Sequence, residues 1–217
     1  MQSPDLTPAP LRNIPGLYPS VRRLPFPLPD AQELHAILST RFPDADSRDY
    51  LDRLACGAAA PVRLFALSLL PPLLDAAGMS GDGCCLRRDA NGRPFLQRQG
   101  SSAQPADFSL SHSRAHAACF LWVGEGRIGV DVEESVTGER AARLANRFLS
   151  AGERALLSDN DISTGFTRIW TRREALCKQD GGGQPLRFDS ANFSDRVRLA
   201  SFRLPDTGAF LTVCLPN

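Results

Sequence analysis

The sequence has almost no net charge and no uninterrupted apolar run long enough to span a membrane. Its 25 Lys and Arg residues stand against 24 Asp and Glu residues, which gives a formal net charge of +1. This balance argues against general binding to nucleic acid or to a membrane surface, so any anion-binding site must be local. The most apolar segment, residues 58–74, is interrupted by Arg63 and by prolines. We interpret it as a buried helix rather than a membrane span.

Cysteine patterns typical of metal or redox sites are missing as well. The six cysteines show no C-x-x-C spacing, and the N-terminus has no basic flank followed by an apolar stretch and a cleavage site. These features predict reduced thiols and a cytoplasmic protein. A chain of 217 residues fits one ordinary domain or two small halves.

Proline is concentrated at the N-terminus, where eight of the 17 prolines precede Asp30. We therefore predict that residues 1–29 form an extended or disordered arm without a regular helix or central strand. Asp30 and Glu33 have the spacing of a capping box at the start of a helix. Two further helices are expected near residues 47–56 and 61–70, the second ended by Pro71 and Pro72.

The second half of the chain alternates between strand and helix patterns. Strands are predicted over residues 118–123, 128–133, 197–204 and 209–215, and helices around 141–148, 150–157 and 166–178, the last ending at Gly181–Gly183. Helices interleaved with hairpins predict an α+β fold.

Two acidic residues share one face of a predicted strand. Residues on a strand alternate between its faces, so Asp131 and Glu133 lie roughly 7 Å apart at their Cα atoms. Their carboxylates suit a hard cation such as Mg²⁺. A solvent-exposed hairpin face is the alternative that this short motif leaves open.

Glu174 and Lys178 lie one turn apart on the predicted helix 166–178, beside its apolar stripe. The carboxylate could act as a third metal ligand or a general base, and the lysine could neutralise a leaving phosphate. An ordinary ion pair between successive turns is the alternative.

Four further side chains suit phosphate oxygens. Ser111 and His112 are adjacent, Arg93 follows an Asn-Gly turn, and Arg63 is the single charge in its apolar segment. Structural or surface roles for these residues are the alternatives.

The order of these pieces resembles the 4′-phosphopantetheinyl transferases of the larger, surfactin-synthetase-activating type. That family has a G-K-P turn, an F-N-x-S-H-S strand, a G-[IV]-D-[IV]-E strand and a W-[ST]-x-K-E-[AS]-x-x-K helix. The matching segments here are NGRPF from Asn91, FSLSHS from Phe108, GVDVEE from Gly129, RFLSAGE from Arg147 and WTRREALCKQDGGG from Trp170. The match covers residues 91–193. Ser109, Arg93 and Arg173 depart from the family pattern of Asn, Lys and Lys.

The resemblance implies a set of roles. Asp131, Glu133 and Glu174 would hold Mg²⁺ against the pyrophosphate of coenzyme A. Lys178 would contact the same pyrophosphate and assist the departing 3′,5′-ADP. Phosphates of coenzyme A would be bound by Ser111, His112, Arg93 and Arg63, with Arg48 as a further cation. Glu174, Lys178 and His112 would form the catalytic set, in which Glu174 draws the proton from a serine hydroxyl of an acyl or peptidyl carrier protein.

The same resemblance implies a pseudo-dimer of two similar α/β lobes with the active site at their interface. The lobes would cover residues 30–106 and 107–217 of a monomer, and Arg140, Arg143 and Arg147 would offer a basic docking patch to an acidic carrier. Two alternatives stay open. One is an impaired homologue that binds coenzyme A or a carrier as a scaffold, and the other is a metal-dependent phosphatase or nuclease.

Overall fold

The fold is α+β, as the sequence predicts. We describe it from a computed structural model for residues 3–79, 83–98, 105–181 and 197–217. The helices are η1 (Ala9–Asn13), α1 (Ala31–Arg41), α2 (Ala45–Leu54), α3 (Ala60–Ser68), α4 (Leu70–Ala76), α5 (Gly138–Phe148), α6 (Ala151–Ala155), η2 (Asp159–Asp161) and α7 (Ile162–Asp180). The strands are β1 (Leu17–Arg23), β2 (Cys84–Arg88), β3 (Pro94–Arg98), β4 (Ala106–His112), β5 (His116–Val123), β6 (Gly129–Glu133), β7 (Val197–Arg203) and β8 (Phe210–Pro216).

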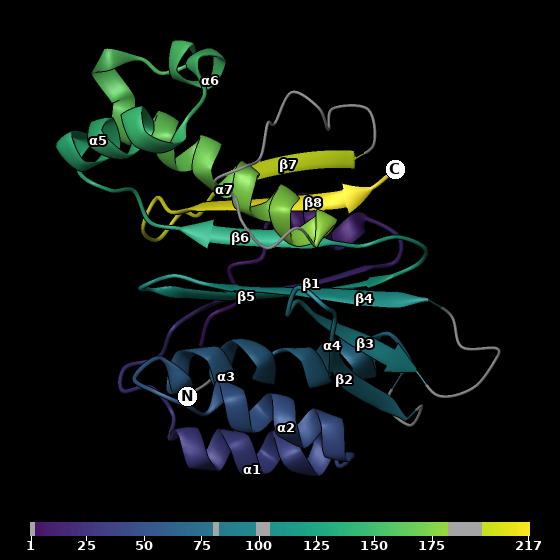
Figure 1. Ribbon diagram of the computed structural model, residues 1–217. Coiled ribbons are helices and arrows are strands. Elements are labelled where there is room, and N and C mark those ends of the chain that lie inside the picture. The colour runs from purple at the N-terminus through teal and green to yellow at the C-terminus, as the bar shows by residue number, and fades with distance from the viewer. Residues whose placement is uncertain (1–2, 80–82, 99–104, 182–196) are drawn as a thin grey trace.

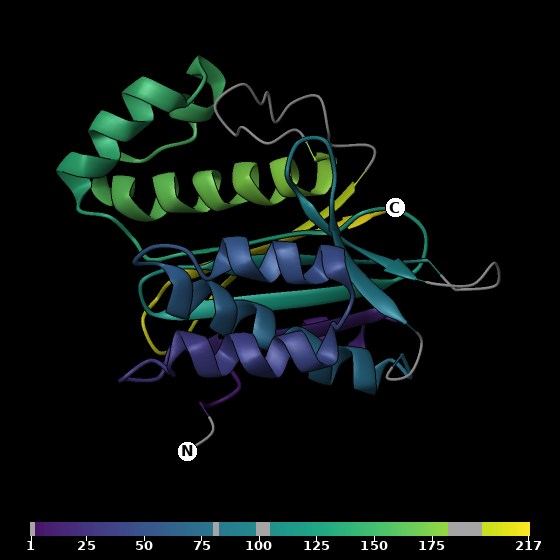
Figure 2. The same cartoon turned by 60° about the horizontal axis from the view of Figure 1, so that its bottom comes forward.

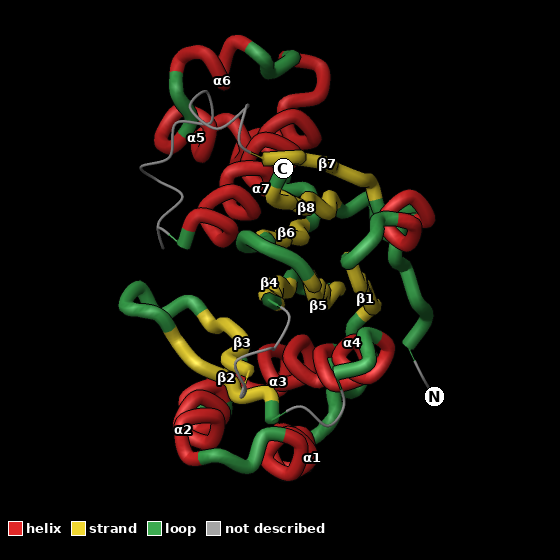
Figure 3. The backbone as a smooth tube through the Cα atoms, turned by 90° about the vertical axis from the view of Figure 1, so that its right-hand side faces the viewer, coloured by secondary structure: helices red, strands yellow, loops and turns green. Residues whose placement is uncertain are grey.

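Two three-stranded antiparallel sheets lie face to face in the middle of the molecule (Figure 1). The first has the strand order β1-β5-β4 and the second β6-β8-β7. Helices α1–α4 cover the outer side of the first sheet, and α7 lies along the outer side of the second (Figure 2). Figure 3 shows the resulting layers end-on, with β2 and β3 forming a separate hairpin beside the first sheet.

Strand β5 is apolar along most of its length because both of its faces are covered. Cys119 and Leu121 are buried among the residues of the helical layer, whereas Ala118 and Phe120 belong to the core between the two sheets. Successive side chains point to opposite faces, so a central strand with both faces covered is apolar throughout.

The Pro-rich N-terminal arm contributes to the first sheet. Strand β1 pairs antiparallel with β5, and Pro19 lies opposite Phe120. Because β1 is the edge strand, it tolerates a residue that has no backbone N–H to donate. Within residues 1–29, predicted to be extended or disordered, the structure has the short helix η1 and the edge strand β1.

Local signals predicted most helix ends. Asp30 accepts hydrogen bonds from the amides of Gln32 and Glu33 at the start of α1, and Ser150 and Glu153 form a complete capping box at α6. The expectation that Pro71 and Pro72 end a helix is wrong. They occupy the first turn of α4, where a missing N–H costs no helical hydrogen bond. Of the glycines predicted to end α7, Gly181 is its left-handed cap, and Gly182 and Gly183 lie outside the described residues.

The boundary predicted between residues 106 and 107 falls at the start of β4. The core continues across it, because Leu67 of α3 shares one cluster with Phe108 and Leu121. Within the described ranges, no helix is both long and apolar enough to cross a membrane.

Candidate active site

The candidate site lies where α7 crosses β6, next to the end of β4. Strand β6 carries Asp131 and Glu133, and α7 carries Glu174 and Lys178. The two elements touch at Gly129, where an added Cβ would lie 1.9 Å from the carbonyl oxygen of Ala175. Only glycine allows this approach, so the crossing point is set by the sequence itself.

Asp131 is the centre of the hydrogen bonds in the site. Its side chain is only 5% exposed, and its Oδ1 accepts from Ser111 Oγ at 2.8 Å and from Lys178 Nζ at 2.7 Å. Lys178 Nζ also donates to the carbonyl oxygen of Val130 at 3.0 Å. The other carboxylate oxygen, Oδ2, is buried and has no hydrogen-bond partner among the described residues.

Glu133 and Glu174 surround Asp131 with further negative charge. Burial, followed by the charges of Asp131, Glu134 and Glu174, raises the pKa of Glu133 to about 7, against the opposing effect of Lys178. Burial and then Asp131 likewise raise the pKa of Glu174. Asp131 makes both glutamates harder to ionise, and a cation placed among the three carboxylates would favour their charged forms.

The types of side chain at this site suit a hard cation. Carboxylate oxygens are the ligands that Mg²⁺ prefers, and the unpartnered Oδ2 of Asp131 is available to such an ion. As they stand, however, the His, Cys, Asp and Glu side chains of the described residues include no group of three arranged to hold a metal. Lys178 occupies Oδ1 of Asp131 instead.

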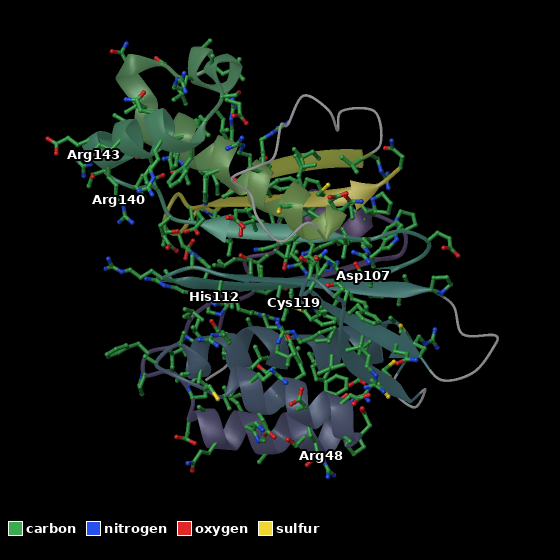
Figure 4. The ribbon with its side chains drawn as sticks, in the orientation of Figure 1. Arg48, Asp107, His112, Cys119, Arg140 and Arg143 are labelled. Carbon is green, nitrogen blue, oxygen red and sulfur yellow. The ribbon has the colours of Figure 1, made fainter. Side chains whose placement is uncertain are left out.

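His112 lies in the same region, with the positive charge of Arg63 near it. Burial, followed by the charges of Lys178 and Arg63, lowers the pKa of His112, while Asp131 opposes the shift. Arg63 belongs to α3, which packs against β4. Figure 4 shows His112 at the end of β4. The structure thus brings Ser111, His112 and Lys178 to Asp131, with Arg63 near His112, although these residues come from distant parts of the sequence.

Arg48 lies elsewhere. It belongs to α2, in the outer helical layer away from His112 (Figure 4), and lines a surface groove with His35 and Asp52. The suggestion that it assists phosphate binding at this site is therefore wrong.

A row of side chains on β4 joins it to the free edge of β6, a feature that the sequence analysis missed. Asp107, Ser109 and Ser111 accept hydrogen bonds from the amides of Ile128, Val130 and Val132 at 2.9, 3.0 and 3.2 Å, respectively. The three acceptor residues on β4 are spaced two positions apart, as are the three donor residues, which is the side-chain period of a strand. The feature of the sequence that could have predicted this row is a polar residue at every second position of β4.

The contacts of Arg93 differ from the phosphate contact that the sequence predicts for it. Its guanidinium forms a paired contact with Asp107, at 2.9 and 2.5 Å, and also donates to the carbonyl oxygens of Ile128 and Lys178. The side chains of Arg93 and Asp107 are only 10% and 9% exposed. Each of its nitrogens thus donates to an acceptor of the protein, although Arg93 also lines the cavity beside the site. Arg173, the other arginine at a lysine position of the family, pairs with Glu153 in the interior.

A cavity of about 270 Å³ opens beside the site. It lies between the β2–β3 hairpin, β4 and α7, and its lining includes Asn91, Leu110, Glu174 and Lys178. The cavity therefore adjoins two of the predicted catalytic side chains and offers space for a ligand next to them.

Comparison with known proteins points to the same class as the predicted motifs. Residues 127–211, which run from just before β6 into β8, match the family model of the 4′-phosphopantetheinyl transferase superfamily. This match confirms the resemblance inferred from the motifs and includes Asp131, Glu133, Glu174 and Lys178.

Individual relatives agree with the family model. The chain is 40% identical over 119 residues to the 4′-phosphopantetheinyl transferase AcpT of Escherichia coli, which is 52% of this chain and 58% of the relative. It is 39% identical over 85 residues to AcpT of Salmonella typhimurium, 38% of this chain and 44% of the relative. It is 34% identical over 108 residues to the 4′-phosphopantetheinyl transferase Sfp of Bacillus subtilis, 47% of this chain and 46% of the relative. The chain thus spans about half the length of the curated relatives it matches.

Proposed function

We propose that this protein transfers the 4′-phosphopantetheine group of coenzyme A to a serine hydroxyl of an apo acyl or peptidyl carrier protein. The observation that carries the proposal is the convergence of Asp131, Glu133, Glu174 and Lys178 where α7 crosses β6. These residues lie within the segment that matches the superfamily. The names of the relatives, all 4′-phosphopantetheinyl transferases, support the same reaction.

The proposed reaction breaks the phosphoanhydride bond of the coenzyme A pyrophosphate and forms a phosphate ester with serine. The serine oxygen of the carrier attacks the β-phosphorus of coenzyme A, the bond from that phosphorus to the bridging oxygen breaks, and 3′,5′-ADP leaves. Such a transfer needs alignment and charge neutralisation more than covalent help from the protein. Glu174 accepts the serine proton, because burial and Asp131 raise its proton affinity.

Cations and a metal would neutralise the pyrophosphate. In this proposal Lys178 contacts the pyrophosphate and stabilises the departing 3′,5′-ADP, and Arg63, Ser111 and His112 bind phosphates. A bound Mg²⁺, held by Asp131, Glu133 and Glu174, would neutralise charge that develops on phosphate oxygens. Arg93, whose donors face the protein, takes no part in phosphate binding in this proposal.

Two finer aspects of the family belong to the proposal as well. The face-to-face sheets, each covered on its outer side by helix, are compatible with a pseudo-dimer of similar lobes. The proposed enzyme is a cytoplasmic monomer whose site lies between the β4 and β6 layers.

The direct test is modification of a carrier. Incubation with coenzyme A, Mg²⁺ and a panel of apo-carriers from fatty-acid, polyketide and peptide synthesis should add the mass of one phosphopantetheine to at least one carrier. The Glu174→Gln variant is the matched control, because it keeps the size of the side chain and removes the base. Tight binding of coenzyme A in calorimetry with no carrier modified would instead select the scaffold alternative.

A further inference from the structure

The β2–β3 hairpin reaches the C-terminal end of α7 (Figure 2), and two of its side chains bind carbonyl oxygens there. Asn91 Nδ2 donates to the carbonyl of Gly181 at 2.7 Å, and Arg93 Nε donates to the carbonyl of Lys178 at 2.7 Å. The last carbonyls of a helix have no partners within it and form the negative end of its dipole. An amide and a guanidinium donor therefore stabilise this end of α7.

The rest of the Arg93 guanidinium ties the hairpin to two other elements. Asp107 on β4 pairs with it, and Nη2 donates to the carbonyl of Ile128 at 2.9 Å, immediately before β6. Asp107 also accepts from the amide of Ile128 at 2.9 Å. One buried ion pair thus joins β4, the start of β6 and the last turn of α7.

Both the backbone and the ammonium group of Lys178 are consequently held in place. Its backbone carbonyl is bound by Arg93, and its ammonium is bound by Asp131 and by the carbonyl of Val130. A shift of the last helical turn would move the ammonium away from Asp131.

From this geometry we infer that Arg93, assisted by Asn91, is a positioning residue that fixes the last turn of α7 against β6 and so places Lys178 and Glu174 beside Asp131. The catalytic consequence rests on the proposed function. The structural part does not, since it concerns only how the hairpin holds the helix.

Hydrogen exchange tests the structural part without any turnover. In Arg93→Gln, the amides of residues 175–180 should lose protection by about tenfold or more, because the last turn then opens more often. Asn91→Ala should show a smaller loss at the same amides. Arg88→Gln is the matched control, since Arg88 is an exposed arginine of the same hairpin whose Nε donates to Gly92 within the turn. Unchanged protection in both Arg93→Gln and Asn91→Ala would overturn the inference.

Kinetics then separates positioning from phosphate contact. A misplaced catalytic group lowers kcat by about 10²-fold, and because Lys178 is proposed to contact the pyrophosphate, any loss of affinity for coenzyme A in calorimetry should accompany the faster exchange at residues 175–180. A weakened affinity for coenzyme A with unchanged kcat and unchanged exchange would show that Arg93 contacts phosphate, and would overturn the inference. Failure of the unsubstituted protein to modify any carrier would overturn the proposed function and leave the exchange result intact.

Arg93→Lys tests the geometry of the guanidinium. Lysine keeps the charge but lacks the planar fork that binds Asp107 and two carbonyls together. We expect exchange at residues 175–180 to stay fast in this variant. Full protection would show that charge alone suffices and would contradict the positioning role of the fork. If Arg93→Gln does not fold, Asn91→Ala carries the test, because Asn91 is exposed and its loss removes a single bond to α7.

Discussion

Asp131 accepts a hydrogen bond from Ser111 and an ion pair from Lys178 through one oxygen, while its other oxygen is buried without a described partner. Two glutamates whose pKa values are raised, Glu133 and Glu174, lie beside it. At the residue scale, the site therefore concentrates negative charge in a place that only a cation can balance.

Replacing the proposed base should remove activity while the protein stays folded. Glu174→Gln is expected to lower kcat by about 10²- to 10⁴-fold, the usual contribution of a general base. Its thermal midpoint should stay the same or rise, because the variant loses a carboxylate that repels Asp131. Carrier modification followed by mass spectrometry, together with a melting curve, measures both effects. Transfer at the full rate would contradict the role of Glu174.

His116 joins three elements and contributes stability that depends on pH. Its imidazole is 0% exposed and lies 3.0 Å from both Glu134 and Asp206. Burial would lower the pKa of His116, but the hydrogen bonds to Glu134 and Asp206 outweigh burial and raise it above 6.5. The pKa of Glu134 is lowered to about 2, so this carboxylate stays ionised across the neutral range.

His116→Gln should therefore destabilise the protein most at mildly acidic pH. A raised pKa adds stability that is complete below the unfolded value and is lost as pH rises through the folded value. We expect a loss of about 1–3 kcal/mol at pH ~5.5 and a smaller one at pH ~9, measured by urea unfolding. His35→Gln, at a surface pair with Asp52, should cost less than about 1 kcal/mol. An equal loss from His116→Gln at both pH values would contradict the contribution of a charged imidazole.

At the scale of elements, α7 and β6 form a unit because Gly129 lets them touch. In Gly129→Ala the new Cβ would overlap the Ala175 carbonyl and approach the amide of Gln179, so the helix must move. We expect a loss of stability of about 1–3 kcal/mol, the usual cost of overpacking, and a lower transfer rate. Gly152→Ala on α6 meets nothing within 4 Å and should change stability by about 1 kcal/mol or less. Urea unfolding of both variants measures the difference, and equal stabilities would show that the contact does not constrain the crossing.

Local sequence features predicted where helices and strands form better than they predicted what packs around each one. The capping residues Asp30 and Ser150 gave helix starts, and the alternation in residues 128–133 gave β6. The same alternation did not predict that Asp131 is buried, because burial depends on α7, which follows about 30 residues later in the chain. Arg93 illustrates the same limit: its sequence neighbours allow a surface role, whereas Asp107 and the end of α7 bind its guanidinium.

At the scale of the molecule, α5 presents exposed arginines on the same side as His112. Figure 4 shows Arg140 and Arg143 extending from α5 on this side, and Arg48 in the distant helical layer. The placement of Arg140 and Arg143 supports α5 as the docking surface for an acidic carrier, a role that stays a prediction.

Charge reversal on α5 should weaken the carrier interaction selectively. The double variant Arg140→Glu and Arg143→Glu is expected to raise the KM for an acidic carrier by about tenfold at low salt, because electrostatic attraction speeds association. The KM for coenzyme A should not change. Arg48→Glu makes the same charge change at a distant surface and should leave both constants unaltered. If all three arginine positions gave equal effects, the net charge of the protein rather than α5 would be responsible.

The pairing of β1 with β5 was beyond sequence analysis, because about 100 residues separate the two strands. It has a consequence for how the protein forms during synthesis. Strand β1 leaves the ribosome about 100 residues before its partner β5, and the core between the sheets is completed only when β8 has emerged. Contacts between such distant segments slow folding, so β1 of the nascent chain stays unpaired until β5 has been made.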